Sequence, residues 1–252
     1  MNTQMSINDT KVEAINQLGN SYLNLKMVPE LENLPKVNII QEVEFIDCIC
    51  YRCTQNKYGI VDPNTEEKIF DLKENGLCLE RFFCFPCRGF MMKINNTGGN
   101  IRNTYDGEKG CSLPCLCGNG CGQPSIKVTL TAPNNKFLGS VKMDYENCCL
   151  SICSHKIIIR NEKKETKYYI QRTSYCIGCY CECFPKCCDI LYHIYEGSQA
   201  VGEVKKVKCS SCYTFCPKGD NYSISFPPNA SPEEKFLIII GVILLDYISF
   251  YC

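Results

Sequence analysis

The feature that most constrains the fold is a long apolar run at the C-terminal end of the chain. The segment from Lys235 to Tyr251 reads KFLIIIGVILLDYISFY, contains one acid, Asp246, and is followed by Cys252. No other long apolar run interrupts the short alternating segments of the sequence. The run must therefore lie either in a lipid bilayer or inside the protein's own core.

The residues before the run predict where its helix begins. Ser231 is suited to the N-cap position, Pro232 to the first helical position, and Glu234 lies three residues after the cap. This is the pattern of a capping box, and the two acids also suit the positive end of the helix dipole. We therefore expect a helix from about Pro232 to the end of the chain.

The length of the run favours burial over a membrane span. Residues 236–251 make about 24 Å of helix, whereas a bilayer core asks for about 20 apolar residues. Asp246 inside a bilayer would cost up to about 3 kcal/mol. A helix that is apolar all round is equally suited to the centre of a protein. We expect Phe236, Ile240 and Asp246 to lie in the core, although hydropathy alone also allows a membrane helix.

Charge and length exclude some classes of protein. The chain has 252 residues with 27 basic and 27 acidic side chains, and a nucleic-acid binder is expected to be basic. Residues 1–30 are polar and show no signal peptide, so we expect a flexible arm on a protein kept in the cytosol. We expect one domain over residues 31–252, with residues 232–252 as its hydrophobic C-terminal helix.

Short segments of alternating polarity fill most of that domain. Turn signals such as Asp62-Pro63-Asn64 separate them, and this spacing is typical of an all-β sandwich or barrel. A barrel of about a dozen strands has room for a helix inside. The expected strands are Val37–Ile46, Tyr58–Val61, Lys68–Leu72, Phe90–Ile94, Ile126–Ala132, Phe137–Met143, His155–Ile159, Lys167–Gln171, Ile190–Tyr195, Val201–Val207 and Tyr222–Phe226.

Six short segments form a specific signal when they are taken together and in order. They are Asn56–Ile60, Cys84–Phe90, Cys111–Cys117 with the following strand to Pro133, Ile157–Glu165, Asp220–Pro227 and Leu244–Tyr247. In this order they resemble segments of the phospholipid scramblase family, whose fold is Tubby-like. The resemblance covers about residues 33–252.

The resemblance implies a mainly β fold, a closed antiparallel barrel of about twelve strands around a buried C-terminal helix. It also implies ATP-independent movement of phospholipids between membrane leaflets in both directions, triggered by calcium, at the cytoplasmic face of the plasma membrane. Such an activity translocates lipid and is not an enzymatic reaction. The sequence also lacks the GxSxG, HExxH and P-loop patterns of common enzymes.

The calcium site that the resemblance implies is incomplete in this chain. Asp220 remains as a charged ligand, but Lys218 and Asn229 stand where the family has acids. A calcium ion needs several oxygen ligands, mostly carboxylates. We therefore prefer a plain turn before a strand at Asp220.

The cysteines are numerous, with 23 in the chain. An odd count in a reducing compartment argues against a disulfide framework and leaves buried thiols, zinc ligands or acylation sites. By resemblance, palmitate would be attached to a Gly-rich cluster, and a zinc knuckle is the alternative there. A second possible zinc set joins two CxxC pairs. The first cluster is Cys111, Cys115, Cys117 and Cys121, and the second set is Cys176, Cys179, Cys209 and Cys212.

Three functions follow from these observations. The first is a lipid scramblase whose partner is a phospholipid membrane. It needs a polar path through about 30 Å of hydrocarbon, supplied either by insertion of residues 236–251 or by bilayer thinning in a homo-oligomer. The second is an acyl-anchored adaptor that binds lipid or protein without transport. The third is a zinc-stabilised, Cys-rich interaction domain.

Overall fold

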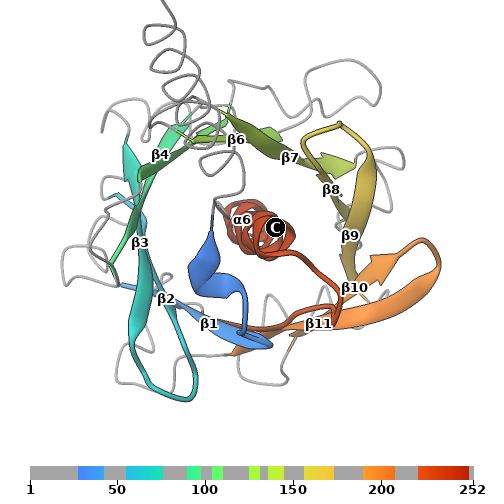
Figure 1. Ribbon diagram of the computed structural model, residues 1–252, viewed down its shortest axis with the longest axis horizontal. Helices are drawn as coiled ribbons and strands as arrows, with labels where there is room; N and C mark the ends of the chain where they lie inside the picture. Colours follow the sequence, from blue (N-terminus) through green and yellow to red (C-terminus); the bar gives the residue numbers. More distant parts are fainter. Residues whose placement is uncertain are drawn as a thin grey trace, which may run out of the picture.

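The structure is a computed structural model, which describes a large part of the sequence. The described residues are 28–42, 55–75, 90–97, 104–109, 125–130, 136–144, 156–172, 190–207 and 221–249. They form a ring of β-strands with one long helix through its middle (Figure 1).

Twelve strands are present in the described residues, and every neighbouring pair is antiparallel. Strand β1 is hydrogen-bonded to β2 on one side and to β12 on the other, so the ring closes and each of these twelve strands has a partner on both sides. The strands are β1 Lys36–Gln41, β2 Lys57–Val61, β3 Lys68–Asn75, β4 Phe90–Asn96, β5 Thr104–Lys109, β6 Ser125–Leu130, β7 Phe137–Asp144, β8 Lys156–Arg160, β9 Thr166–Arg172, β10 Ile190–Glu196, β11 Gln199–Val207 and β12 Asn221–Ser225.

The prediction of a mainly β fold packed against a C-terminal helix is confirmed. Each of the eleven expected strands coincides with an observed strand, within a few residues at either end. The largest difference in the described part is β3, which was expected to end at Leu72 and continues to Asn75. Strand β5 was not predicted, because Asp106, Gly107 and Glu108 have low strand propensity. Its pairing with β4 and β6 on both sides forms the strand.

Alternation of side chains along the strands builds the interior. In β8, Ile157 and Ile159 are buried while their neighbours are partly exposed, and β1 and β9 follow the same period of two. Because every strand sends one face inward, the twelve strands together produce an apolar tube. The C-terminal helix is the element that fills it.

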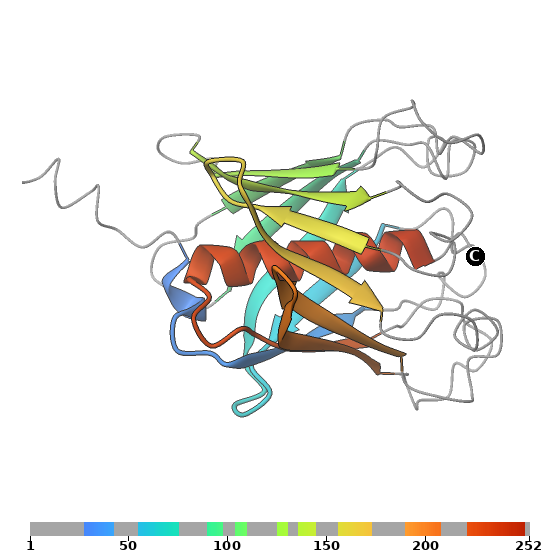
Figure 2. The ribbon, with the colours of Figure 1, turned by 90° about the vertical axis from the view of Figure 1, so that its right-hand side faces the viewer.

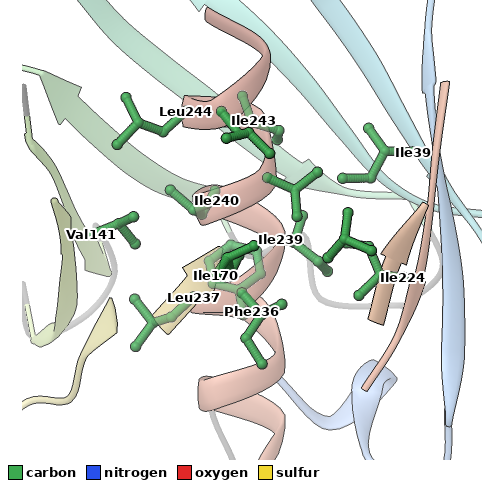
Figure 3. Packing of buried hydrophobic residues seen from close by; sticks show 14 of the residues in the cluster. Ile39, Val141, Ile170, Ile224, Phe236, Leu237, Ile239, Ile240, Ile243 and Leu244 are labelled. Atoms are coloured by element: carbon green, nitrogen blue, oxygen red, sulfur yellow. The ribbon is translucent and has the colours of Figure 1, made fainter. Parts of the chain in front are cut away.

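Helix α6, Pro232–Ser249, runs along the axis of the barrel (Figure 2). The apolar side chains from Phe236 to Leu245 are buried on every side of the helix, and Phe236 and Ile240 are both fully enclosed. Figure 3 shows Leu237 and Ile240 facing Val141 while Ile239 faces Ile224. The predicted burial of the helix is therefore confirmed. Each such side chain stabilises the fold by about 1.5–3 kcal/mol when it leaves water. Within the described residues, no helix meets the length and apolarity needed to cross a membrane.

The segment before β1 closes the barrel end where α6 begins. Val28 and Leu31 are fully buried, and Pro29–Leu31 forms a short 3-10 helix, η1, that contacts α6. The expected arm over residues 1–30 lies mostly outside the described residues. Residues 28–30 belong to the folded domain instead, because the apolar Val28 is buried and Pro29 begins η1.

The helix fits closely against β7, which gives a test of the packing. A methyl group on Gly139 would lie 2.4 Å from the Arg160 backbone oxygen and 2.6 Å from the Leu237 side chain. We expect Gly139→Ala to lower the free energy of unfolding by about 1–3 kcal/mol, as overpacking does. In the control, Gly59→Ala, the new methyl group meets only the flexible end of the Lys68 side chain. Urea unfolding that gives equal stabilities for both variants would contradict close packing at Gly139.

Candidate functional site

The two ends of the barrel differ in what they carry. Strands with odd numbers run toward one end and strands with even numbers run back from it, because all neighbours are antiparallel. Helix α6 follows β12 and therefore begins at the second end and finishes at the first. The first end is called the cysteine end below, and the second is called the η1 end.

All 23 cysteines lie outside the described residues, yet the topology fixes where their segments leave the barrel. Twenty-two of them fall in the six connections that join an odd strand to the next even strand, and Cys252 follows α6. Every one of these segments departs from strand or helix termini at the same end. The six connections are residues 42–56, 76–89, 110–124, 145–155, 173–189 and 208–220.

The beginning of α6 carries the predicted capping box. The Glu234 backbone N–H donates to Ser231 Oγ at 3.2 Å, and the Ser231 backbone N–H donates to Glu234 Oε2 at 2.9 Å. The Tyr168 hydroxyl also donates to Glu234 Oε2, at 3.4 Å. Burial raises the pKa of Tyr168, and the Glu234 and Glu196 carboxylates raise it further. Tyr168 therefore stays protonated and remains a donor to the cap.

Lys235 ties the start of α6 to the N-terminal segment. Its ammonium donates to the backbone oxygens of Leu31, Glu32 and Leu34 at 2.9, 3.0 and 2.9 Å. The side chain is buried, and the ammonium lies 5.7 Å from the Phe226 ring centroid. Burial lowers the pKa of Lys235, while the Glu32 charge acts in the opposite direction. Three carbonyl oxygens use all three N–H donors of the ammonium and offset its loss of hydration.

Asp246 anchors the other end of the helix inside the cysteine end. Its side chain has no exposed surface. The Tyr58 and Tyr222 hydroxyls donate to its two carboxylate oxygens, each at 2.7 Å. The buried Lys206 ammonium lies 5.8 Å from the Tyr222 ring centroid. Burial of Asp246 was predicted. Its partners were not, because they come from β2 and β12, far away in the sequence.

A second group of polar side chains lies inside the same end. Glu74 is fully buried on β3, and its Oε2 accepts from the Asn56 side-chain amide at 2.9 Å. The Gln41 side-chain amide donates to Asn56 Oδ1 at 3.4 Å, and the Gln41 backbone N–H donates to Asn221 Oδ1 at 3.3 Å. The barrel interior thus changes from apolar at its middle to hydrogen-bonded and charged at the cysteine end.

The predicted ligand residues fall largely outside the described part. Asn229 lies exposed in the turn between β12 and α6, at the η1 end. Lys218 and Asp220 lie outside the described residues, as do the cysteines of both predicted clusters. Among the residues that the structure describes, no three His, Cys, Asp or Glu side chains gather as a metal site would require. The calcium, palmitate and zinc assignments therefore stay predictions.

Comparison with known proteins agrees with the sequence motifs. A family model described as Scramblase matches residues 18–251. A human protein named phospholipid scramblase family member 5 is 23% identical over 239 residues, which cover 92% of this chain and 82% of that protein. No solved structure matches, so the Tubby-like name for the fold stays a prediction.

The Lys235 contacts predict a specific loss of stability. Lys235→Met keeps the length of the side chain but removes the ammonium donor from three carbonyl oxygens, of which Leu31 O keeps only the Leu34 backbone N–H, at a cost of about 1–3 kcal/mol. We expect lower stability in urea together with faster amide hydrogen exchange at residues 31–34. The matched control is Lys163→Met in the exposed β8–β9 turn, where a surface change stays within about 0.5 kcal/mol. Unchanged exchange at residues 31–34 would show that Lys235 does not hold this segment.

The Asp246 contacts predict a second loss. Tyr58→Phe and Tyr222→Phe each remove one hydroxyl from the buried carboxylate, and we expect each to lower the free energy of unfolding by about 1–3 kcal/mol. Tyr195→Phe is the control, because that ring stacks on Tyr169 on the outer wall. If the two buried variants unfolded at the same denaturant concentration as the control, the carboxylate would not depend on these donors.

Proposed function

Because the chain belongs to the scramblase family, we propose that it moves phospholipids between the leaflets of a membrane in both directions without ATP. The observation that carries this proposal is the family match over residues 18–251, nearly the whole chain. The related human protein is itself named a phospholipid scramblase family member. The activity is translocation, with no covalent step for which a catalytic residue would be needed.

The buried helix decides how such an activity can operate. A headgroup that crosses a bilayer needs a polar path through about 30 Å of hydrocarbon. Helix α6 does not provide one, because its side chains from Phe236 to Leu245 are enclosed by the strands. Transport therefore requires either that α6 leave the barrel and insert, or that several copies thin the bilayer. The Lys235 and Asp246 contacts oppose the first route, so we favour thinning by a homo-oligomer.

Attachment to the membrane is proposed to come from palmitate. Two acyl chains suffice for stable anchoring, since each buried CH₂ adds about 0.8 kcal/mol. The residues proposed to carry them are Cys111, Cys115, Cys117 and Cys121, which lie in the connection between β5 and β6. Because that connection departs from the cysteine end, the acyl chains would hold this end toward the cytoplasmic face of the membrane, which we propose is the plasma membrane.

We propose that calcium, if it triggers the activity, binds weakly at Asp220. Asp220 is the one acid retained from the family pattern, and Lys218 replaces another with a positive charge. A hard cation bound through so few carboxylates would be held weakly. We therefore expect a response only at calcium concentrations well above those that sensor proteins require.

A second candidate is an acyl-anchored adaptor that binds lipid or protein without transport. The enclosed, doubly anchored α6 favours it, because a barrel whose core is complete needs no rearrangement to act as a tethered binding domain. Both candidates place the protein on a phospholipid membrane and differ only in whether lipid crosses.

Reconstitution separates the two candidates. The full chain is placed in liposomes with a fluorescent phospholipid in both leaflets, and a membrane-impermeant quencher is added with and without calcium. Scrambling predicts that quenching exceeds half of the signal, because inner-leaflet lipid becomes accessible. An adaptor predicts that quenching stops at the outer leaflet, as in protein-free liposomes.

Two further measurements address the cysteines. Release of the cell-expressed protein from membranes by hydroxylamine supports thioester acylation. A variant with Ser in place of Cys111, Cys115, Cys117 and Cys121 should show no membrane association that hydroxylamine can release. Stoichiometric zinc in unacylated protein would instead support the zinc-stabilised domain, with Cys176, Cys179, Cys209 and Cys212 as the proposed ligands.

A further inference from the structure

Three lysines face one another directly on the outer wall of the barrel. Lys57 on β2 is in register with Lys73 on β3, and Lys73 is in register with Lys93 on β4. Their strand neighbours Tyr58, Leu72 and Met92 are buried, so the three lysines project outward. We call these three residues the lysine row.

The lysine row opposes the stability of the sheet. Like charges directly opposite one another on neighbouring strands repel. Lys57 has a partner of its own, so the repulsion that remains is between Lys73 and Lys93. Glu42 and Asp71 are hydrogen-bonded to Lys68, at 2.6 and 3.1 Å, and Asp106 lies opposite Lys93 at the end of the row. No ion pair joins Lys73 or Lys93 to another described residue. An arrangement that works against folding is often a sign of function.

The same bias extends around the cysteine end. Among the three residues of each strand nearest that end, nine are Lys or Arg and three are Asp or Glu. At the opposite strand ends the corresponding numbers are four and two. The barrel therefore has an excess of positive charge at one end, although the net charge of the whole chain is zero.

Exposed apolar side chains gather at the same end. The large hydrophobic residues exposed in the described part are Ile40, Met91 and Val207, with relative exposures of 40%, 56% and 37%. Each lies within two residues of a strand terminus at the cysteine end. Met91 projects from the same face of β4 as Lys93, one pleat nearer that end.

We propose that the outer wall at the cysteine end docks on an anionic phospholipid surface, with Lys73 and Lys93 against headgroups and Met91 among them. Positive charge combined with isolated exposed apolar side chains fits a lipid surface, since each lysine near an anionic leaflet contributes about 1 kcal/mol. A nucleic acid would use the charge but not Met91. This orientation rests on the proposed function for its partner, a membrane, but it requires neither acylation nor lipid transport.

Equilibrium binding of the full, unacylated chain to vesicles tests the docking surface. Vesicles of phosphatidylserine and phosphatidylcholine are compared with vesicles of phosphatidylcholine alone by co-flotation. For Lys73→Gln/Lys93→Gln we expect about 10- to 30-fold weaker binding to the anionic vesicles and little binding of any form to the neutral ones. Met91→Ser should weaken binding to anionic vesicles while leaving binding to heparin, a soluble polyanion, unchanged.

The matched control removes the same charge elsewhere. Lys163→Gln/Lys164→Gln changes two exposed lysines in the β8–β9 turn at the η1 end. We expect the vesicle binding of this variant to stay within about twofold of that of the parent protein. Charges farther from the vesicle surface than a Debye length of about 10 Å are screened. Thermal unfolding supplies a second readout. Lys73→Gln/Lys93→Gln should melt at the same temperature as the parent or higher, since repulsion is removed.

The possible outcomes separate this inference from the proposed function. No binding to anionic vesicles, equal binding by Lys73→Gln/Lys93→Gln and the parent, or an equal loss in the control would overturn the docking surface. So would binding to heparin with no preference for anionic vesicles. If Lys73→Gln/Lys93→Gln selectively lost binding to anionic vesicles while the parent protein moved no lipid in liposomes, the docking surface would be supported and the scramblase activity would be ruled out.

Discussion

Burial of an all-apolar helix is the constraint on which the rest of this structure depends. A helix with side chains such as Ile238, Ile239 and Ile240 in succession has no polar face to turn toward water, so it needs partners on every side. A flat sheet can cover only one side of such a helix. A ring of strands that pairs β1 with β12 covers all of them and gives each of these twelve strands a partner on both sides, so one arrangement serves both the helix and the sheet.

The polar contacts at the two ends of α6 determine its position within that ring. Apolar packing alone would allow the helix to slide or rotate, since one isoleucine resembles the next. Lys235 fixes its start against backbone oxygens of the N-terminal segment, and Asp246 fixes its end against hydroxyls from β2 and β12. A buried charge without these partners would be strongly destabilising. The contacts therefore set the register of the helix as well as its stability.

The two barrel ends also differ in composition. The η1 end is closed by a buried segment that contacts the helix. The cysteine end carries every cysteine-bearing connection, an excess of basic strand residues and the exposed apolar side chains. Buried polar contacts hold the core at both ends, whereas the outer wall that we propose docks on a membrane lies at the cysteine end alone.

The sequence by itself determined the local features of the protein: the capping box at Ser231, the apolar helix, and the strands whose burial alternates with a period of two. These follow from neighbouring residues, and so they could be predicted. Strand β5 could not be predicted, because its residues have little intrinsic preference for a strand. It forms because β4 and β6 pair with it on both sides. The tyrosine partners of Asp246, the carbonyl partners of Lys235 and the lysine row were decided only by the tertiary structure. Each joins residues that are distant in the sequence, and closure of the ring in a single register is what brings them together.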